Sequence, residues 1–282
     1  MIIAPNKQEI QEASEKFNSV AHIEKISKNG NELEYEKKFI FKELDEGTEL
    51  LQMFTLRYLV YRYVNFIEPN KHQLDIDCYD FYSTFLGAFE ATGQRKRLVG
   101  TVRIISGDNI SPHAELIKSI IYNLNGHKIS KLSNKTTLFP IMQTYNIPNE
   151  YLRAFYADKN GSQTQNSKPF EISRLAIMPE YWCIKERIEA GIHELVLLDA
   201  WKSNPNKNIY FIATHPRTKR KYEKLGFKII PGTNVRLYKH IKQLAIAMVL
   251  NLDNYLKNPN PYSQQCKSRF KSYLEKGYFE RN

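Results

Sequence analysis

Apolar residues recur at two different periods along this chain, and each period predicts one kind of element. From Leu33 to Phe41 apolar and polar residues alternate, as they do in a half-buried strand. From Leu50 to Phe66 apolar residues return at helical spacing, and this helix must end before Pro69. Thr48, with an acidic residue next to it in the first turn, is the expected N-cap.

The next apolar runs predict a hairpin and then an irregular segment. Strands are expected at Phe81–Ala91 and Leu98–Ile105, and the Thr92-Gly93-Gln94 turn joins them as a hairpin. Residues 107–169 hold no sustained period and are interpreted as an insertion with short helical pieces. Within it, the polar run 159–167 has the composition of a loop.

The last third of the chain returns to regular elements. The pattern predicts a strand at Phe170–Ile177, a helix at Ile184–Lys202, a strand at Ile209–Ala213, a helix at Arg217–Leu225 that ends at Gly226, a hairpin of Phe227–Ile230 with Val235–Tyr238, and an amphipathic helix at Ile241–Tyr255. This order implies an α/β (α+β) fold with a mixed twisted sheet covered by helices. We expect a polar N-terminal arm (1–32), one main domain (33–240) and a C-terminal helical extension (241–282).

Composition limits the classes of protein that this chain belongs to. Its 282 residues are 42% hydrophobic and 12% aromatic, which supports a sizeable core and excludes global disorder. No run is long and apolar enough to span a membrane, and no signal peptide is visible. The three cysteines are far apart, which fits a reducing compartment, so we expect a cytoplasmic protein without disulfides or a zinc site.

The net charge of +11 is compatible with nucleic acid, anionic lipid or an acidic protein as a partner, and charge alone does not rank them. More specific are two charges, Glu171 and Arg174, in a strand that should be apolar. Such groups are expensive to bury unless they are paired or functional. On an ideal strand these two side chains face opposite sides.

Four short motifs carry a family resemblance when they are taken in order. They are Arg57-x-x-x-Tyr61, Asp77-Cys78-Tyr79-Asp80, Gly100-Thr101-Val102-Arg103 and Glu171-Ile172-Ser173-Arg174. With them, over about residues 50–240, the chain resembles the N-acyl-homoserine-lactone (autoinducer) synthases and the long-chain N-acyl amino acid synthases. Those families share the GNAT acyltransferase fold, and the string from Tyr222 to Phe227 resembles the last helix-to-strand junction of that superfamily.

The resemblance implies transfer of a fatty acyl chain from a carrier-protein thioester to an amine. The candidate site residues are Glu171, Arg174 and Tyr222 as catalytic groups, and Arg57, Asp77, Asp80 and Arg103 as substrate-binding groups. Glu171 is the best candidate to take the amine proton, and Tyr222 is placed to protonate the departing sulfur. Asp77 and Asp80 would hold the acceptor ammonium. The alternatives are a structural ion pair of Glu171 with Arg174, a core tyrosine and solvated loop carboxylates.

In the superfamily that the chain resembles, the central strand carries a β-bulge. A bulge between Glu171 and Arg174 would redirect one of these side chains and splay the strand away from Ile209–Ala213. The exposed backbone groups would then bind the amides of a pantetheine arm like an added strand. His215, which follows the latter strand, is expected to cap the strand end rather than to act as a base.

Departures from the family pattern refine the expected substrates. Phe66 lies near the position of a usual Trp, and residues 104–107 replace a typical Leu-Pro-Thr string, which favours the amino-acid-acylating relatives. Residues 179–187 lack the glycines with which many acetyl-CoA-dependent members cradle a pyrophosphate. A carrier protein presents a single phosphate and is typically acidic, so Arg187 and the Arg217–Lys221 cluster are candidate docking groups.

We therefore expect an N-acyltransferase that moves a fatty acyl group from acyl carrier protein to the amine of an amino acid or related small molecule. The acyl-phosphopantetheine donor is a substrate, and no tightly bound cofactor or metal is expected. The alternatives are an acyl-CoA-dependent GNAT enzyme, an autoinducer synthase, or a basic binding module without catalysis. No recognised motif supports nucleic-acid binding.

Overall fold

The computed structural model describes residues 38–93, 95–107, 109–125, 137–152, 168–203, 208–238, 241–252 and 261–281. The predictions for the N-terminal arm (1–32) and for the polar run 159–167 lie outside the described residues.

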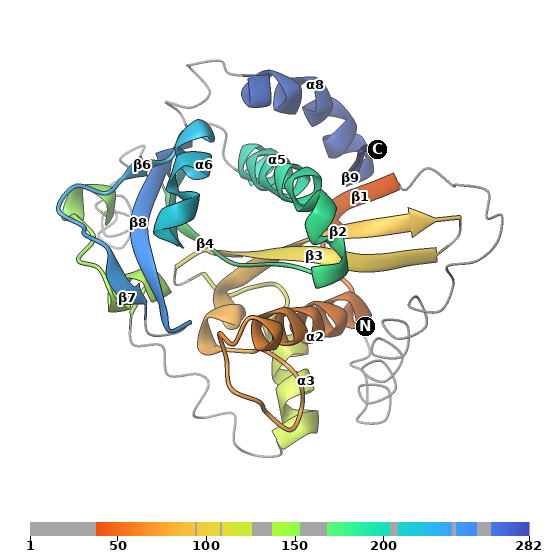
Figure 1. The fold of residues 1–282 in the computed structure, drawn as a ribbon. Helices are drawn as coiled ribbons and strands as arrows, with labels where there is room; N and C mark the ends of the chain where they lie inside the picture. The colour runs from red at the N-terminus through yellow and green to blue at the C-terminus, as the bar shows by residue number, and fades with distance from the viewer. Residues whose placement is uncertain are drawn as a thin grey trace.

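The described strands form one mixed sheet that runs through the molecule (Figure 1). They are β1 (Lys38–Glu43), β2 (Ser83–Thr92), β3 (Arg95–Ile105), β4 (Lys168–Ile177), β5 (Asn208–Thr214), β6 (Lys228–Ile229), β7 (Arg236–Tyr238), β8 (Gln243–Asn251) and β9 (Tyr278–Arg281). Their order is β6-β8-β5-β4-β3-β2-β1-β9, and β7 pairs with β8 beside this path. The β4–β5 pair is parallel, and the other pairs are antiparallel.

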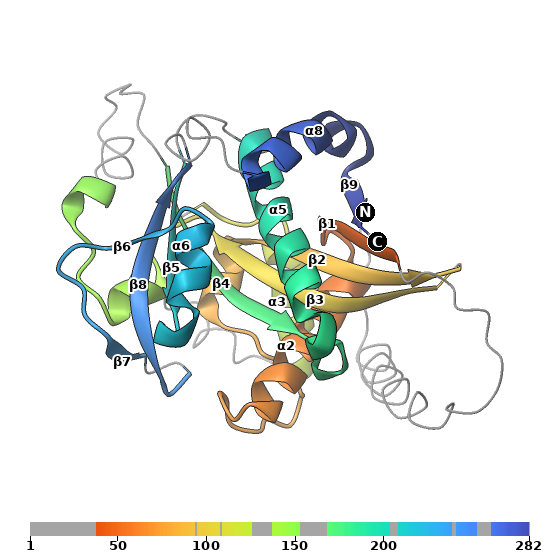
Figure 2. The same cartoon turned by 45° about the horizontal axis from the view of Figure 1, so that its top comes forward.

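Helices cover both faces of this sheet. The longer ones are α2 (Gly47–Tyr63), α3 (Ala114–Asn125), α5 (Lys185–Ser203), α6 (Lys219–Lys224) and α8 (Pro261–Lys276), and the short 3₁₀ turns are η1 (Cys78–Tyr82), η3 (Pro140–Gln143), η4 (Pro179–Ile184) and η5 (Pro216–Thr218). Helices α2 and α3 lie on one face, and α5 and α8 lie on the other (Figures 1 and 2). This mixed sheet with helices confirms the predicted fold class.

Helix α5 packs unusually close to the sheet. A Cβ added to Gly191, in the middle of α5, would lie 2.1 Å from the ring of Phe41 on β1. No real Cβ contact is that short, so only glycine permits this approach of helix to strand. On the opposite face α2 is apolar on most of its sides, and its fully buried residues include Leu50, Met53 and Phe54.

The largest difference from the sequence prediction concerns Ile241–Tyr255, which we predicted to be an amphipathic helix. Gln243–Asn251 is instead strand β8, hydrogen-bonded to β5 on one side and β6 on the other. Its residues 245–250 are buried without a break. A short continuous apolar run fits a strand covered on both faces as well as it fits a buried helix, so periodicity alone does not separate them.

This strand changes the domain boundary as well. Residues 241–282 are not a helical extension, because β8 and β9 belong to the sheet. The described helix of this region is α8, which packs on α5 through the rings of Trp201 and Phe270, with centroids 4.9 Å apart.

Two smaller predictions were also wrong. Residues 227–230 and 235–238 do not pair with each other; β6 and β7 each pair with β8. Thr48 is not the N-cap of α2, because the helix already begins at Gly47 and Glu46 occupies the cap position. The helix end at Gly226 is confirmed by its positive φ of 91°.

Candidate active site

Strand β4 carries a bulge at Arg174. Along β3, Thr101 pairs with Ala176 and Arg103 pairs with Ser173, so β4 holds one extra residue between these pairs. Arg174 itself has a φ of 56°, in the left-handed region that a non-glycine residue seldom adopts. The predicted bulge is thereby confirmed.

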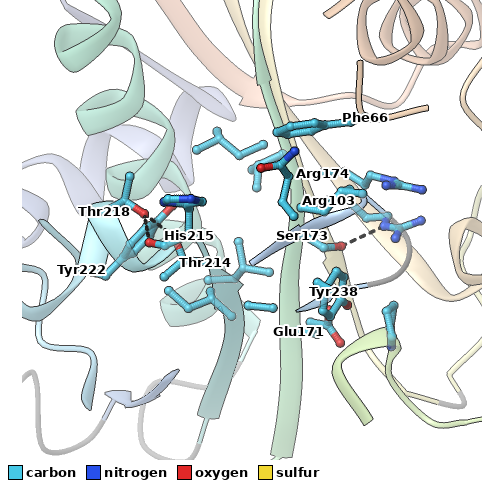
Figure 3. Close-up of a pocket in the computed structure, with 18 of the residues that line it drawn as sticks. Phe66, Arg103, Glu171, Ser173, Arg174, Thr214, His215, Thr218, Tyr222 and Tyr238 are labelled. Atoms are coloured by element: carbon cyan, nitrogen blue, oxygen red, sulfur yellow. Dashed lines mark hydrogen bonds between the residues drawn. The ribbon is translucent and has the colours of Figure 1, made fainter. Parts of the chain in front are cut away.

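After Glu171, just before the bulge, β4 separates from β5. The two strands pair only over Lys168–Glu171 and Asn208–Phe211, while β5 continues to Thr214 against β8. A cavity of about 340 Å³ lies at this point. Its lining includes Glu171 and Arg174 from β4, Thr214 from β5 and Tyr222 from α6, so the splay places residues from distant segments around one space (Figure 3).

At one wall of the cavity three guanidinium groups meet three carboxylates. Arg57 Nε donates to Asp75 Oδ2 at 2.9 Å, and its Nη1 donates to Asp80 Oδ1 at 2.8 Å. Arg103 Nη1 donates to Asp80 Oδ1 at 2.9 Å and to Asp77 Oδ1 at 2.6 Å. The charges in this cluster balance, so its burial does not leave an unpaired ion.

Arg174 joins the same cluster from the bulge. Its Nη2 donates to Asp77 Oδ2 at 3.1 Å, and its Nε lies 3.2 Å from Asp75 Oδ2. Its guanidinium also lies over the ring of Tyr61, 5.4 Å from the centroid. The cluster therefore fixes the side chain whose backbone conformation is strained.

The cluster divides the predicted substrate-binding residues into two groups. Asp77 and Arg103 line the cavity, whereas Arg57 and Asp80 do not and are fully buried behind them. Asp80 also accepts the backbone N–H of Asp77 at 2.8 Å, which closes a capping box at the start of η1. Sequence reasoning missed Asp75; its signal was the alternation Asp75-Ile76-Asp77, which places two carboxylates on one side of an extended segment.

Glu171 does not join this cluster. Its Oε2 accepts the backbone N–H of Ile141 at 2.9 Å, and no ion pair links it to Arg174 among the described residues. The side chain is 1% exposed, and burial raises the pKa of its carboxyl group to about 8, although the Ile141 hydrogen bond opposes the change. The alternative of a structural Glu171–Arg174 ion pair is therefore wrong.

Tyr222 lies on the other side of the cavity from Glu171 (Figure 3). Its helix ends in a Schellman motif, because Phe227 N–H donates to the Tyr222 carbonyl and Gly226 N–H donates to the Glu223 carbonyl, both at 3.0 Å. The ring packs edge-on against His193 and Phe227. Burial raises the pKa of Tyr222 well above its usual value, so the hydroxyl keeps its proton at neutral pH.

His215 is the N-cap of η5, where its Nδ1 accepts the backbone N–H of Arg217 at 3.1 Å. The capping role expected from the sequence is confirmed, and the side chain also lines the cavity. Phe66 lines the cavity too, packed on Tyr61 with ring centroids 5.9 Å apart.

A comparison with protein families matches residues 56–137 to the family described as "Acetyltransferase (GNAT) domain". The match runs from α2 through the β2–β3 hairpin and beyond α3, and it contains Arg57, Asp77, Asp80 and Arg103. It confirms the GNAT resemblance of the sequence motifs. The fold and this match together indicate an acyltransferase of GNAT type.

Several solved structures are similar to this chain. FeeM, an N-acyl amino acid synthase from uncultured soil microbes, is 16% identical with a TM-score of 0.49, over 82% of this chain and 99% of FeeM. MesI, a CoA-dependent acyl-homoserine lactone synthase, is 14% identical with a TM-score of 0.43, and the likeness covers 79% of this chain and 87% of MesI. Escherichia coli ElaA is 11% identical with a TM-score of 0.42, and the likeness covers 77% of this chain and 100% of ElaA. A search of the curated proteins found no match.

Within the described part of the chain, no group of three or more His, Cys, Asp or Glu is placed to hold a metal ion. None of the described helices is both long and apolar enough to cross a membrane.

Proposed function

We propose that this protein is an N-acyltransferase that takes a fatty acyl group from an acyl-carrier-protein thioester and joins it to the amine of an amino acid or related small molecule. The observation that carries the proposal is that Glu171 and Tyr222 line one cavity, at the point where β4 bulges away from β5. Thioester aminolysis needs one group that takes the amine proton and one that protonates the departing sulfur. The cavity contains a candidate for each.

Glu171 takes the proton of the attacking amine, directly or through one water. A carboxylate with an ordinary pKa is a weak base, whereas a pKa of about 8 brings Glu171 closer to the proton affinity of an amine. The hydrogen bond from Ile141 N–H holds one carboxyl oxygen in place. Glu171 also lines the cavity in which the reacting groups would meet.

Tyr222 supplies the proton to sulfur when the C–S bond breaks. Its raised pKa keeps the hydroxyl protonated until the thiolate forms. At the end of the reaction the amine nitrogen is bonded to the acyl carbon, the thiol carries the proton of Tyr222, and Glu171 carries the amine proton. Proton exchange with water restores both side chains.

The acceptor lies against Asp77 and Arg174. Asp77 lines the cavity with 28% of its side chain exposed, so it is the carboxylate of the buried cluster that a ligand reaches. Burial opposes its ionisation, but Arg103 and Arg174 hold the pKa of Asp77 well below its usual range. An ionised Asp77 attracts the ammonium of an amino acid, and Arg174 is the adjacent cation for its carboxylate.

Two features support a carrier protein as the donor. Tyr181 is 4% exposed and donates its hydroxyl to Glu90 at 2.5 Å, and it thereby anchors the 3₁₀ turn η4, which is the segment before α5. This segment has none of the glycines with which a pyrophosphate loop approaches its ligand. In addition, η5 and α6 expose Arg217, Arg220 and Lys224 beside cavity residues of the same segment. An acidic partner is complementary to that surface.

The direct test incubates the purified protein with an acyl carrier protein or acyl-CoA and a mixture of amino acids, and measures products by mass spectrometry. We expect an acyl-amine product that depends on the carrier-protein donor, and loss of that product in Glu171→Gln. Absence of product with both donors would contradict an acyltransferase function. Equal rates with acyl-CoA and with the carrier protein would contradict the choice of donor.

A charge reversal tests where the carrier protein docks. Arg217→Glu with Arg220→Glu should raise the KM for the acylated carrier protein by about tenfold at low salt and leave activity with a short acyl-pantetheine unchanged. Arg95→Glu with Lys96→Glu, on the distant β2–β3 hairpin, is the matched control. Equal effects of the two double variants would contradict the α6 surface as the docking site.

A further inference from the structure

His215 is fixed on the cavity wall by two contacts. The backbone N–H of Arg217 donates to its Nδ1 at 3.1 Å, and Thr218 Oγ1 donates to its backbone carbonyl at 2.7 Å. Pro216 follows it, and Thr218 is further held by Thr214, with the two hydroxyls 2.7 Å apart. Neither the backbone nor the ring of His215 therefore turns freely.

The bond from Arg217 also decides which ring nitrogen carries the proton. A nitrogen that accepts from an N–H uses its lone pair and holds no proton, so neutral His215 carries its proton on Nε2. In this tautomer Nε2 donates a hydrogen bond, and the ring has no free lone pair. His215 is therefore unsuited to act as a general base and suited to bind an oxygen.

The two walls of the cavity have different chemistry. Thr214, His215 and Tyr222 belong to one wall, which β5, η5 and α6 provide (Figure 3). Glu171 and Arg174 belong to the opposite wall, on β4 (Figure 3). The first wall offers proton donors, and the second offers the candidate base.

We propose that His215 donates its Nε2–H to the carbonyl oxygen of the acyl thioester and stabilises the negative charge that develops there. This role rests on the proposed function and adds a catalytic residue to it. The sulfur and the carbonyl oxygen of a thioester are bonded to the same carbon, so their two donors belong on one wall, and Tyr222 and His215 share that wall. The amine then approaches from the side of Glu171.

The electrons and protons balance in this arrangement. As the amine nitrogen bonds to the acyl carbon, the π electrons of the carbonyl move onto its oxygen, which accepts the hydrogen bond from His215 without taking the proton. On collapse the carbonyl forms again and the C–S bond breaks. The proton of Tyr222 goes to sulfur, and Glu171 keeps the amine proton. His215 ends the cycle in its starting tautomer.

Two variants remove the donor and keep the cap. His215→Ser and His215→Asn each retain an oxygen that accepts the N–H of Arg217. Removal of one oxyanion donor lowers kcat by roughly 10²–10³-fold. We expect a loss of about 100-fold in kcat, with the KM of the acyl donor and of the acceptor each within about twofold.

His215→Gln provides the rescue, because its amide nitrogen reaches about as far as Nε2 and should recover part of the lost kcat. The role is overturned if the Ser and Asn variants keep kcat within about twofold, or if the acceptor KM rises with unchanged kcat. Thermal unfolding establishes which variants are folded. If only one of the Ser and Asn variants folds, that variant alone is enough for the test. A wild-type protein without product would instead overturn the proposed function itself.

Discussion

Glu171→Gln should change how the stability of this protein depends on pH. In the unfolded chain the carboxyl ionises near its ordinary pKa of 4.5, whereas in the folded protein burial delays ionisation to about pH 8. Between these values the folded state holds a proton that the unfolded state has released. The free energy of unfolding therefore falls as pH rises through this window. Gln removes this term and keeps an oxygen to accept the N–H of Ile141.

The magnitude follows from the displaced pKa. A shift from 4.5 to about 8 corresponds to about 5 kcal/mol over the whole window, at about 1.4 kcal/mol per pH unit. Between about pH 5.5 and 7.5 the wild-type protein should lose about 2.5 kcal/mol relative to the Gln variant. Urea unfolding of both proteins at several pH values gives the difference directly, and groups common to both proteins cancel.

Glu115→Gln is the matched control, because its side chain is 83% exposed on α3. Its stability should run parallel to the wild type within about 0.5 kcal/mol. If the difference in free energy of unfolding between the wild type and Glu171→Gln is also constant from about pH 5.5 to 7.5, Glu171 ionises normally. Such a result would contradict the role of Glu171 as the base of the reaction. The same pKa predicts that kcat/KM of the wild type rises with pH and levels off above about pH 8.

Three further perturbations test other parts of the structure. Asp80→Asn should lower the free energy of unfolding by about 3–5 kcal/mol, because two buried guanidinium groups lose a charged partner. Asp45→Asn is the control: the Asp45 side chain is 67% exposed, so this variant should change the free energy of unfolding by less than about 1 kcal/mol. Similar effects at both sites in denaturant unfolding would refute the buried cluster. Gly191→Ala should destabilise the protein by about 1–3 kcal/mol despite the better helix propensity of Ala, because the added Cβ meets the Phe41 ring. In a double-mutant cycle, adding Phe41→Leu should recover part of this loss of stability. Strictly additive effects would show that the contact is not the cause. Tyr222→Phe should lower kcat by about 10–100-fold at nearly unchanged stability, and the loss should shrink with a donor whose thiol is more acidic. An equal loss with both donors would rule out protonation of sulfur as its role.

The candidate site was found from the sequence because charged residues interrupt otherwise apolar elements. Glu171 and Arg174 interrupt a strand pattern, and both line the cavity. The resemblance to a family supplied the bulge, which the register of β3 and β4 confirms. Such signals are local, since a charge in a buried segment is unfavourable wherever that segment packs.

The sequence did not show which carboxylate pairs with which guanidinium in the buried cluster. Arg57 and Asp80 have the same residue types as Arg103 and Asp77, yet the first pair lies behind the cavity and the second pair lines it. Which carboxylate pairs with which guanidinium depends on the distances that folding sets between α2, η1 and β3. For the same reason the sequence left a Glu171–Arg174 ion pair open, and the structure pairs Arg174 with Asp77 instead.

The sequence by itself determined the periods of α2, α5 and β2 to β5, the helix end at Gly226 and the residues that bring charge into the sheet. These depend on neighbours within a few residues, where backbone geometry and side-chain spacing act directly. Only the tertiary structure decided that residues 243–251 are a strand and that two walls from distant segments enclose one cavity. A short apolar run is buried equally well as helix or strand, and hydrogen-bonding partners from β5 and β6 decide between them.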